Sequence, residues 1–303
     1  MLYGFTGGAD GGQPYAGLID YGGFLWGTTY DGGASNDGTV FKINLATGAE
    51  TTVYTFTGVP DGSHARGQLV YHQGLLFGTT FDGGKYDGGT VFSINPKAGT
   101  EAVLYSFSVG ADGLSPLAGV VAKAGALYGT SYRGGALQYG VAFKIKSKTG
   151  AETVLHDFRG GADGGTPFAG LTFVGTDLFG ATTAGGAAGI GTIFKIGLKP
   201  HRETVLYSFE GGTDGEDPEA SLLAQGGGLY ATTYDGGAGG YGTVVQVSAS
   251  TGDETVLHSF SGVADGANPA GTPVMLGGNL YGVTTSGPGF GVGSYGTVWM
   301  LTP

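Results

Sequence analysis

Short apolar runs separated by glycine-rich breaks set the pattern of this chain, and the stretch between residues 113 and 159 shows it well. The runs there are PLAGVVAK (116–123), ALYGTSY (126–132), GVAFKIK (140–146) and ETVLHDF (152–158). Runs of this length bounded by glycine are typical of β-strands, and no window carries a 3.6-residue apolar stripe long enough for a helix. The stretch therefore predicts a meander of four antiparallel strands.

The same pattern returns along the whole chain. GTVFKI from Gly38 recurs as GTVFSI from Gly89, GVAFKI from Gly140, GTIFKI from Gly191, GTVVQV from Gly242 and GTVWML from Gly296, with four spacings of 51 residues and a last one of 54. A fixed period of this length is the signature of a repeat architecture. Radial repetition leaves only short sheet edges exposed, so we predict an all-β, six-bladed β-propeller of four-stranded antiparallel blades, with residues 1–303 forming a single domain.

The two ends of the chain fit a closed ring. The final unit stops after its third strand, whereas the chain opens with LYGF (2–5), which matches the end of the fourth strand in VLYSF (205–209) and VLHSF (256–260). We therefore predict that the N-terminal strand joins the last blade, because this closes the ring and removes two open edges.

Two aromatic ladders predict the core. One is Phe5, Phe56, Phe107, Phe158, Phe209 and Phe260, and the other is Trp26, Phe77, Tyr128, Phe179, Tyr230 and Tyr281. Each buried aromatic side chain contributes roughly 1.5–3 kcal/mol by transfer bookkeeping. We expect both ladders to pack between sheets rather than to bind a ligand.

Composition narrows the function. The 67 glycines would suggest disorder, but 40% hydrophobic residues and a fixed period indicate ordered repeats. With 13 Lys and Arg against 24 Asp and Glu, the net charge of -11 argues against nucleic-acid partners and anionic membrane surfaces. The absence of cysteine excludes disulfides and thiolate chemistry, and no apolar run is long enough to insert into a membrane.

Several motifs together resemble a known bacterial repeat. GTVFKI (38–43), TGAETV (149–154), LWGTTYDGG (25–33) and the joining segment DFRGGADG (157–164) are similar to the GloVer tandem repeat, a β-propeller-type repeat with kelch-like blades. The resemblance covers the whole chain and implies an extracellular or cell-surface protein, since similar proteins tend to carry export or sorting signals. It implies no catalytic residues. Met1 is followed at once by a repeat already in progress, and we expect a mature or trimmed chain.

An Asp-Gly pair recurs in the loop that precedes each unit. The aspartates are Asp10, Asp61, Asp112, Asp163, Asp214 and Asp265. One interpretation is a ring of calcium ligands. The other is turn chemistry, in which the carboxylate binds nearby backbone N–H groups and the glycine takes a positive φ. We favour the turn, because one aspartate per blade does not supply the several oxygens that calcium needs.

Positions that differ between repeats point to function. Three residues after each ladder aspartate come Gln13, His64, Ser115, Thr166, Asp217 and Asn268, and five residues after it come Tyr15, Arg66, Leu117, Phe168, Glu219 and Ala270. We expect no structural requirement common to the blades to select such mixtures. These side chains should rim the mouth of the central channel, with blades 2 and 5 on opposite sides.

A third variable series follows the second strand of each unit. It runs Asp31, Asp82, Arg133, Ala184, Asp235 and Ser286, next to Tyr30, Phe81, Tyr132, Thr183, Tyr234 and Thr285. Aromatic rings beside carboxylates suit sugars, whereas the alternative is a solvated acidic loop face with incidental drift. The predicted ligand-binding residues are Tyr15, His64, Arg66, Asp82, Arg133, Phe168, Asp217, Glu219 and Tyr234.

Three functional hypotheses follow. The first is a non-enzymatic extracellular scaffold or binding module for a glycan or a surface protein, which we expect to be monomeric and to use no cofactor. The second is a carbohydrate-active enzyme, a polysaccharide lyase or glycoside hydrolase, with Glu219 and Asp235 as its carboxylates. The third is a purely structural ring. No nucleophile-elbow, zinc-protease or P-loop motif occurs, and the histidines show no metal-ligand spacing, so we expect no metal.

Overall fold

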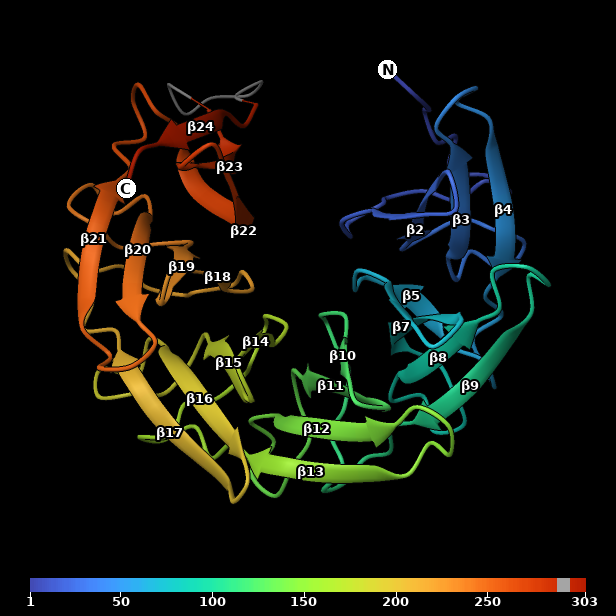
Figure 1. The fold of residues 1–303 in the computed structure, drawn as a ribbon, viewed down its shortest axis with the longest axis horizontal. Helices are drawn as coiled ribbons and strands as arrows, with labels where there is room; N and C mark the ends of the chain where they lie inside the picture. The colour runs from blue at the N-terminus through green and yellow to red at the C-terminus, as the bar shows by residue number, and fades with distance from the viewer. Residues whose placement is uncertain (288–294) are drawn as a thin grey trace. The chain divides into compact units, whose positions relative to one another are not determined.

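The computed structural model describes residues 1–287 and 295–303 and confirms the predicted fold class. The described residues form β-strands and no helix, arranged as the six antiparallel blades of a β-propeller. The chain divides into two compact units, Met1–Asp157 and Phe158–Pro303, and each unit contains three blades (Figure 1). The prediction of a single domain stays a prediction.

Unit 1 holds blades 1 to 3. Blade 1 consists of β1 (Ile19–Tyr21), β2 (Phe24–Thr29), β3 (Thr39–Asn44) and β4 (Glu50–Thr55). Blade 2 consists of β5 (Ser63–Ala65), β6 (Val70–His72), β7 (Leu75–Asp82), β8 (Thr90–Ile94) and β9 (Glu101–Ser106). Its innermost strand is in two pieces, because β5 and β6 both pair with β7. Blade 3 consists of β10 (Val121–Lys123), β11 (Ala126–Ser131), β12 (Val141–Lys146) and β13 (Glu152–Asp157).

Unit 2 holds blades 4 to 6. Blade 4 consists of β14 (Thr172–Val174), β15 (Asp177–Thr182), β16 (Thr192–Leu198) and β17 (His201–Ser208). Blade 5 consists of β18 (Leu223–Gln225), β19 (Gly228–Thr233), β20 (Thr243–Ser248) and β21 (Glu254–Ser259). Blade 6 consists of β22 (Ala267–Leu276), β23 (Asn279–Ser286) and β24 (Val298–Leu301). The sheet of blade 6 has three strands in the described part of the chain.

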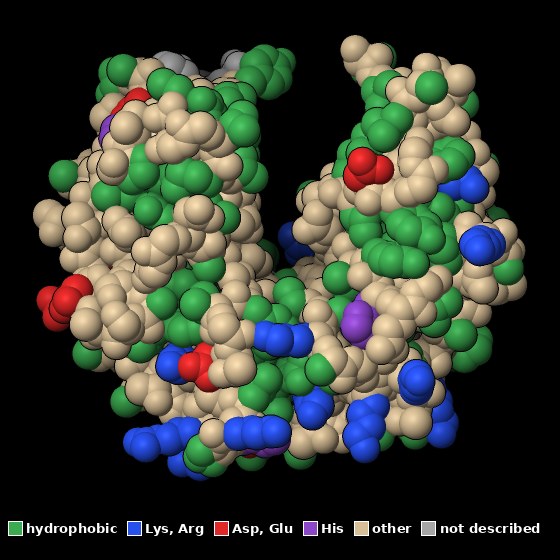
Figure 2. All heavy atoms as spheres, in the orientation of Figure 1, with side chains coloured by type: hydrophobic (Ala, Val, Ile, Leu, Met, Phe, Trp, Pro, Cys, Tyr) green, Lys and Arg blue, Asp and Glu red, His purple; other side chains and the backbone are tan. Residues whose placement is uncertain are grey.

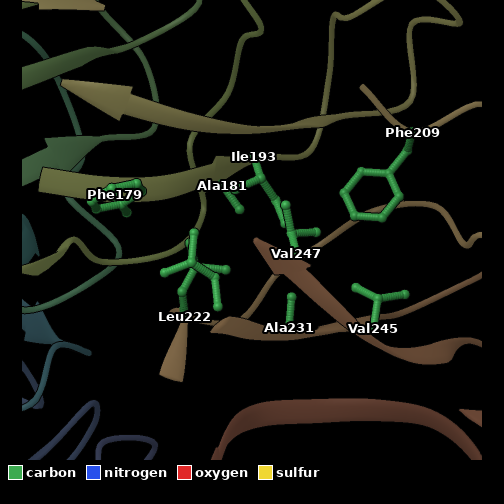
Figure 3. Packing of buried hydrophobic residues seen from close by; sticks show 9 residues of the cluster. Phe179, Ala181, Ile193, Phe209, Leu222, Ala231, Val245 and Val247 are labelled. Atoms are coloured by element: carbon green, nitrogen blue, oxygen red, sulfur yellow. The ribbon is translucent and has the colours of Figure 1, made fainter. Parts of the chain in front are cut away.

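Within each unit, the hydrophobic core lies between adjacent blades. In unit 2, Phe179 and Ile193 of blade 4 belong to one cluster with Leu222 and Val247 of blade 5, all 2% exposed or less (Figure 3). The predicted aromatic ladders are part of this packing. Their buried members are Phe56, Phe107, Phe158, Phe209, Phe260, Trp26, Phe77, Tyr128, Phe179 and Tyr230. Phe5 and Tyr281, which belong to the first and last repeats, are half-buried.

Close packing explains the glycine that recurs in the second strand of most blades. A Cβ added to Gly78 would lie 2.5 Å from Cζ of Phe92 and 2.8 Å from Cδ2 of Leu69. The phenylalanine of the GTVF motif therefore rests on the bare backbone of the neighbouring strand, and no larger residue fits there.

A buried pair of hydroxyls explains the recurring threonines. The hydroxyls of Thr29 on β2 and Thr39 on β3 lie 2.9 Å apart, and the Thr39 backbone N–H donates to the Thr29 hydroxyl at 3.0 Å. Thr80 and Thr90 repeat this pair in blade 2 at 2.9 Å. Buried polar atoms must be hydrogen-bonded, and the hydroxyl on the second strand is kept as Thr or Ser in all six repeats, whereas blade 3 has Val141 at the other position and its backbone N–H donates to the Ser131 hydroxyl at 3.2 Å.

The N-terminal segment packs against blade 1. Phe5 contacts Phe41 of β3 with ring centroids 4.8 Å apart, and Phe56 contacts Phe92 in the same way at 5.1 Å. Phe56 directly follows β4, the outer strand of blade 1, and contacts blade 2. Phe5 contacts blade 1 in the same way, so the N-terminal segment packs as the end of an outer strand does. Residues 1–18, all described, contain no strand. Completion of the last blade by this segment stays a prediction.

Candidate functional site

The aspartates of the Asp-Gly ladder hold the loops that join successive blades. The Asp61 carboxylate accepts hydrogen bonds from the Thr57 backbone N–H at 3.1 Å, the Thr57 hydroxyl at 2.9 Å and the Tyr54 hydroxyl at 2.6 Å. Gly62 follows with a φ of 119°. A backbone N–H four residues earlier is also bound by Asp10, Asp112, Asp163, Asp214 and Asp265. These bonds support the turn interpretation over a calcium ring.

The variable residue three positions after each ladder aspartate has a left-handed backbone in all six blades. The φ values are 53° at Gln13, 58° at His64, 55° at Ser115, 49° at Thr166, 54° at Asp217 and 56° at Asn268. Few non-glycine residues adopt this conformation, and Asn, Asp and His are enriched among them. The expectation of no shared structural requirement is therefore wrong: the backbone favours small or polar residues here, although it does not choose among them.

His64 lies at the centre of a cluster built from the loops of blades 1 and 2. Its ring stacks on Tyr30, with centroids 4.5 Å apart and an angle of 29° between the planes. Its Nδ1 lies 3.3 Å from Oδ2 of Asp82, and its Nε2 lies 3.9 Å from Oδ1 of Asp31. The His64 backbone N–H donates to the Asp37 carbonyl at 2.8 Å, which anchors the turn.

Tyr15 and Arg66 complete this group. The Arg66 guanidinium lies over the Tyr15 ring with Cζ 5.1 Å from its centroid, and Tyr15 meets Tyr30 edge to face at 5.6 Å. Tyr15 is 59% exposed, so a ligand can reach its ring. We name Tyr15, Tyr30, Asp31, His64, Arg66 and Asp82 the His64 cluster. It brings together four of the predicted site residues, Tyr15, His64, Arg66 and Asp82.

The charges of the His64 cluster are partly removed from water. Burial raises the pKa of the Asp82 carboxyl, and the nearby His64 opposes this rise without cancelling it. Burial also raises the pKa of the Tyr30 hydroxyl, helped by the negative charge of Asp82. Hydrogen bonds from a ligand to these groups would therefore face less competition from water.

Blade 5 carries a second group of predicted residues. Burial, Asp235 and Glu216 together raise the pKa of Asp217. The Tyr234 backbone N–H donates to the Asp217 carbonyl at 2.9 Å, and the Asn268 amide donates to Oδ1 of Asp235 at 3.0 Å. This group is acidic, and it lies wholly in unit 2.

The remaining predicted residues lie in other blades. Arg133 of blade 3 is exposed and lies over Tyr132, with Cζ 5.5 Å from the ring centroid. Phe168 of blade 4 and Glu219 of blade 5 are half-buried. Selection by variability therefore found one compact cluster together with residues spread over several blades. Tyr30 and Asp31 belong to the cluster and were absent from the predicted set, although both stand in the variable series beside Asp82.

A row of glutamates lies near the ladder aspartates. One carboxyl oxygen of each is buried and has no hydrogen-bond partner among the described residues; the four are Glu101, Glu152, Glu203 and Glu254. Burial raises the pKa of each to about 7, and the charge of a ladder aspartate adds to the rise. These carboxyls therefore take up protons near neutral pH.

The described residues contain neither a metal-binding cluster nor a membrane-spanning helix. Within residues 1–287 and 295–303, no group of three or more His, Asp or Glu side chains is placed to hold a metal ion. The same residues include no helix that could cross a bilayer.

Comparison with known proteins supports the fold and leaves the ligand open. No curated protein sequence matches the chain. Among solved structures, a crystal structure of a nidogen/laminin complex matches with a TM-score of 0.52 and 16% identity, covering 80% of this chain and 78% of that chain. In all, 409 chains of solved structures match, so the likeness shows a widely used fold and does not single out one function.

Sequence comparison identifies the repeat itself. The family model described as the Gloeobacter/Verrucomicrobia repeat matches residues 1–124 and 99–299, two overlapping stretches that together span nearly the whole chain. The chain belongs to the Gloeobacter/Verrucomicrobia repeat family.

Proposed function

We propose that the chain is a non-enzymatic binding module that holds a glycan or the surface of another protein at the His64 cluster. The observation that carries this proposal is the meeting of side chains from two blades around one imidazole. Aromatic rings, two carboxylates and a guanidinium lie next to one another there, and all are at least partly open to solvent. Mixed linings of this kind suit small polar ligands.

The chemistry favours a sugar among small ligands. The ring of Tyr15 offers an apolar face for the C–H groups of a pyranose, while Asp31 and Asp82 accept hydrogen bonds from its hydroxyls and Arg66 donates them. A protein surface is the second occupant within the same proposal. The nidogen/laminin structure supports it only in that a similar fold occurs in a protein complex.

The same geometry supports binding better than hydrolysis. A glycosidase needs its two carboxyl groups to flank the bond that is cleaved. In the His64 cluster the imidazole lies between Asp31 and Asp82, within 4 Å of both. Glu219 and Asp235, the carboxylates of the enzyme hypothesis, are not part of this cluster. The proposal also includes an extracellular or cell-surface setting and a monomeric chain, as the sequence leads us to expect.

Variants taken from the protein's own repeats test the proposal. His64→Asn and Tyr15→Ala introduce the residues that blade 6 has at these positions, Asn268 and Ala270. The left-handed turn is kept, because Asn268 has a φ of 56°. Glycan arrays and a panel of purified surface proteins are probed with the wild type, the double variant and the control Ser115→Asn. We expect the double variant to lose at least about tenfold in affinity for the wild-type hits, equivalent to about 1.4 kcal/mol. Full binding by the double variant contradicts the proposal.

A further inference from the structure

A recess lies at the other end of the blades in unit 1. β7, labelled in Figure 1, runs from Leu75 to Asp82. Its last residue belongs to the His64 cluster, whereas its first residue lines a cavity of about 500 Å³. Leu75 and Leu104 line this cavity and are half-buried, and the buried Phe77 lies beside them. The volume falls within the range of small-ligand pockets, about 300–1,000 Å³.

A single residue distinguishes blade 2 from the other blades at this place. The fifth position of the GTVFKI motif is Lys42, Ser93, Lys144, Lys195, Gln246 and Met300 in the six repeats. This residue pairs across the sheet with the second aromatic ladder, for example Lys42 with Trp26 and Ser93 with Phe77. Five blades have a long side chain here, and blade 2 has a short one.

The long side chains cover the aromatic rings. Nζ of Lys42 lies 5.4 Å from the Trp26 ring centroid, and Nζ of Lys144 lies 5.9 Å from that of Tyr128. Lysine stems commonly lie along apolar surface in this way. Ser93 is too short to reach over Phe77. The space that a lysine side chain would fill is therefore part of the recess.

The polar rim of the recess is suited to an anion. Lys148 and His72 line it, and Nε2 of His72 is buried without a hydrogen-bond partner in the described structure. The hydroxyl of Ser147 also lines the recess and donates to the Gly125 carbonyl at 3.0 Å. Among the residues that the structure describes, no Asp or Glu side chain lines the recess. Figure 2 shows Lys and Arg side chains next to hydrophobic ones on the visible surface of blades 2 and 3.

We propose that this recess binds a small amphipathic anion, with its hydrocarbon ring or chain over Leu75 and Leu104 and its carboxylate facing Lys148 and His72. The ligand would occupy the place that a lysine stem occupies in blades 1, 3 and 4. Its negative group would pair with Lys148 and satisfy the unpartnered His72 nitrogen. This site is separate from the His64 cluster and does not depend on the proposed function.

Three small probes on the full chain test the proposal. Phenylacetate, the neutral 2-phenylethanol and the cationic phenethylamine share one aromatic body and differ in charge. Calorimetry and ligand-observed NMR should show phenylacetate binding more tightly than either of the others. Ser93→Lys should weaken phenylacetate binding at least about tenfold, because it restores the side chain that covers the ring in blade 1. The matched change Gln246→Lys, at the same position of blade 5, should leave binding unchanged.

Further variants test separately the charge of Lys148 and the open space beside Ser93. Lys148→Glu should weaken phenylacetate binding without weakening 2-phenylethanol binding. If Ser93→Lys does not fold, Ser93→Gln replaces it, since blade 5 already has glutamine at that position. The proposal is overturned if Ser93→Lys, or Ser93→Gln in its place, binds phenylacetate as tightly as the wild type does. It is also overturned if phenethylamine binds as tightly as phenylacetate, or if the wild type shows no binding at about 10 mM phenylacetate.

Discussion

The loops of blades 1 and 2 and those of blade 5 share one backbone design but differ in charge. His64 and Asp217 stand at the same repeat position with φ values of 58° and 54°, and both lie three residues after a ladder aspartate. Around His64, Arg66 accompanies the carboxylates. Around Asp217 the neighbours are Glu216 and Asp235, and the chain from Glu203 to Pro303 contains no Lys or Arg.

This difference indicates that each repeat contains two kinds of loop position. Positions that are the same in every blade, such as the ladder aspartate and its glycine, form the loop. Positions that vary within the fixed loop decide its charge and shape. Changes at invariant positions should therefore lower stability, and changes at variable positions should alter binding while the fold remains.

Removal of a ladder carboxylate should have the largest effect on stability. Asp61 is 7% exposed and accepts bonds from Tyr54 and Thr57. Asp61→Ala leaves these donors unpaired, and we expect it to lower the free energy of unfolding by about 3 kcal/mol. Denaturant titration measures this. Gln13→Asn, a change at the exposed variable position of blade 1 with a φ of 53°, should stay within about 0.5 kcal/mol of the wild type. An equal loss of stability in both variants would contradict the division between invariant positions, which stabilise the loop, and variable positions.

The half-buried glutamates Glu101, Glu152, Glu203 and Glu254 should make the protein less stable as the pH rises. The pKa of Glu101 is about 7 in the folded chain against an ordinary value of 4.5. The folded state therefore binds the proton more tightly than the unfolded state. The resulting stabilisation is fully present below pH 4.5 and is lost as the pH rises through 7. Glu152, Glu203 and Glu254 should behave alike.

Thermal unfolding between pH 5 and pH 8 tests this expectation. The midpoint should fall with rising pH in the wild type. In Glu101→Gln the fall should be smaller, because glutamine has no charge to bury. A midpoint that rises over this range would show that the glutamates are not held in the protonated form.

Binding should distinguish the two loop groups. His64→Asn should weaken binding at the His64 cluster at least about tenfold, or about 1.4 kcal/mol. Asp217→Asn changes the matching position of blade 5 and should alter the affinity for the same ligand less than about twofold. Titration calorimetry with a hit from the glycan array measures both. A larger loss in Asp217→Asn would move the site to unit 2.

The smallest effect is expected at a surface ion pair. Nζ of Lys195 lies 2.6 Å from Oδ2 of Asp177, and the two side chains are 34% and 28% exposed. Pairs of this kind contribute about 0.2–1 kcal/mol. Lys195→Met keeps most of the hydrocarbon stem over Phe179 and removes the charge, so the free energy of unfolding should change by less than about 1 kcal/mol. A greater loss would show that this ion pair is one of the main interactions that stabilise blade 4.

The sequence predicted the strands and the core well, because both follow from patterns within each repeat. Alternating runs and the period of 51 residues predicted the strands, and the aromatic ladders predicted the core between sheets. The copies also act as an internal alignment, and comparison among them selected His64, Arg66 and Asp82 from the variable positions. These three lie in one cluster.

Contacts between blades could not be predicted in the same way. That His64 lies between Asp31 and Asp82 depends on how blade 2 packs against blade 1, and no local pattern encodes it. The left-handed backbone at His64 was also missed, although the polar types at that position hinted at it. Ser93 was visible as the one short residue in its series, but its meaning required the structure.

Hydrogen exchange with a bound ligand tests most directly the claim that the variable loop positions of blades 1 and 2 bind. The wild type is compared with and without a saturating array hit, at the resolution of short peptides. We predict added protection in the loops around residues 13–15, 30–37, 63–66 and 82–87, and none around residues 216–219 and 234–236. Protection confined to the blade 5 loops, or to the turns at the other end of the blades, would contradict the account.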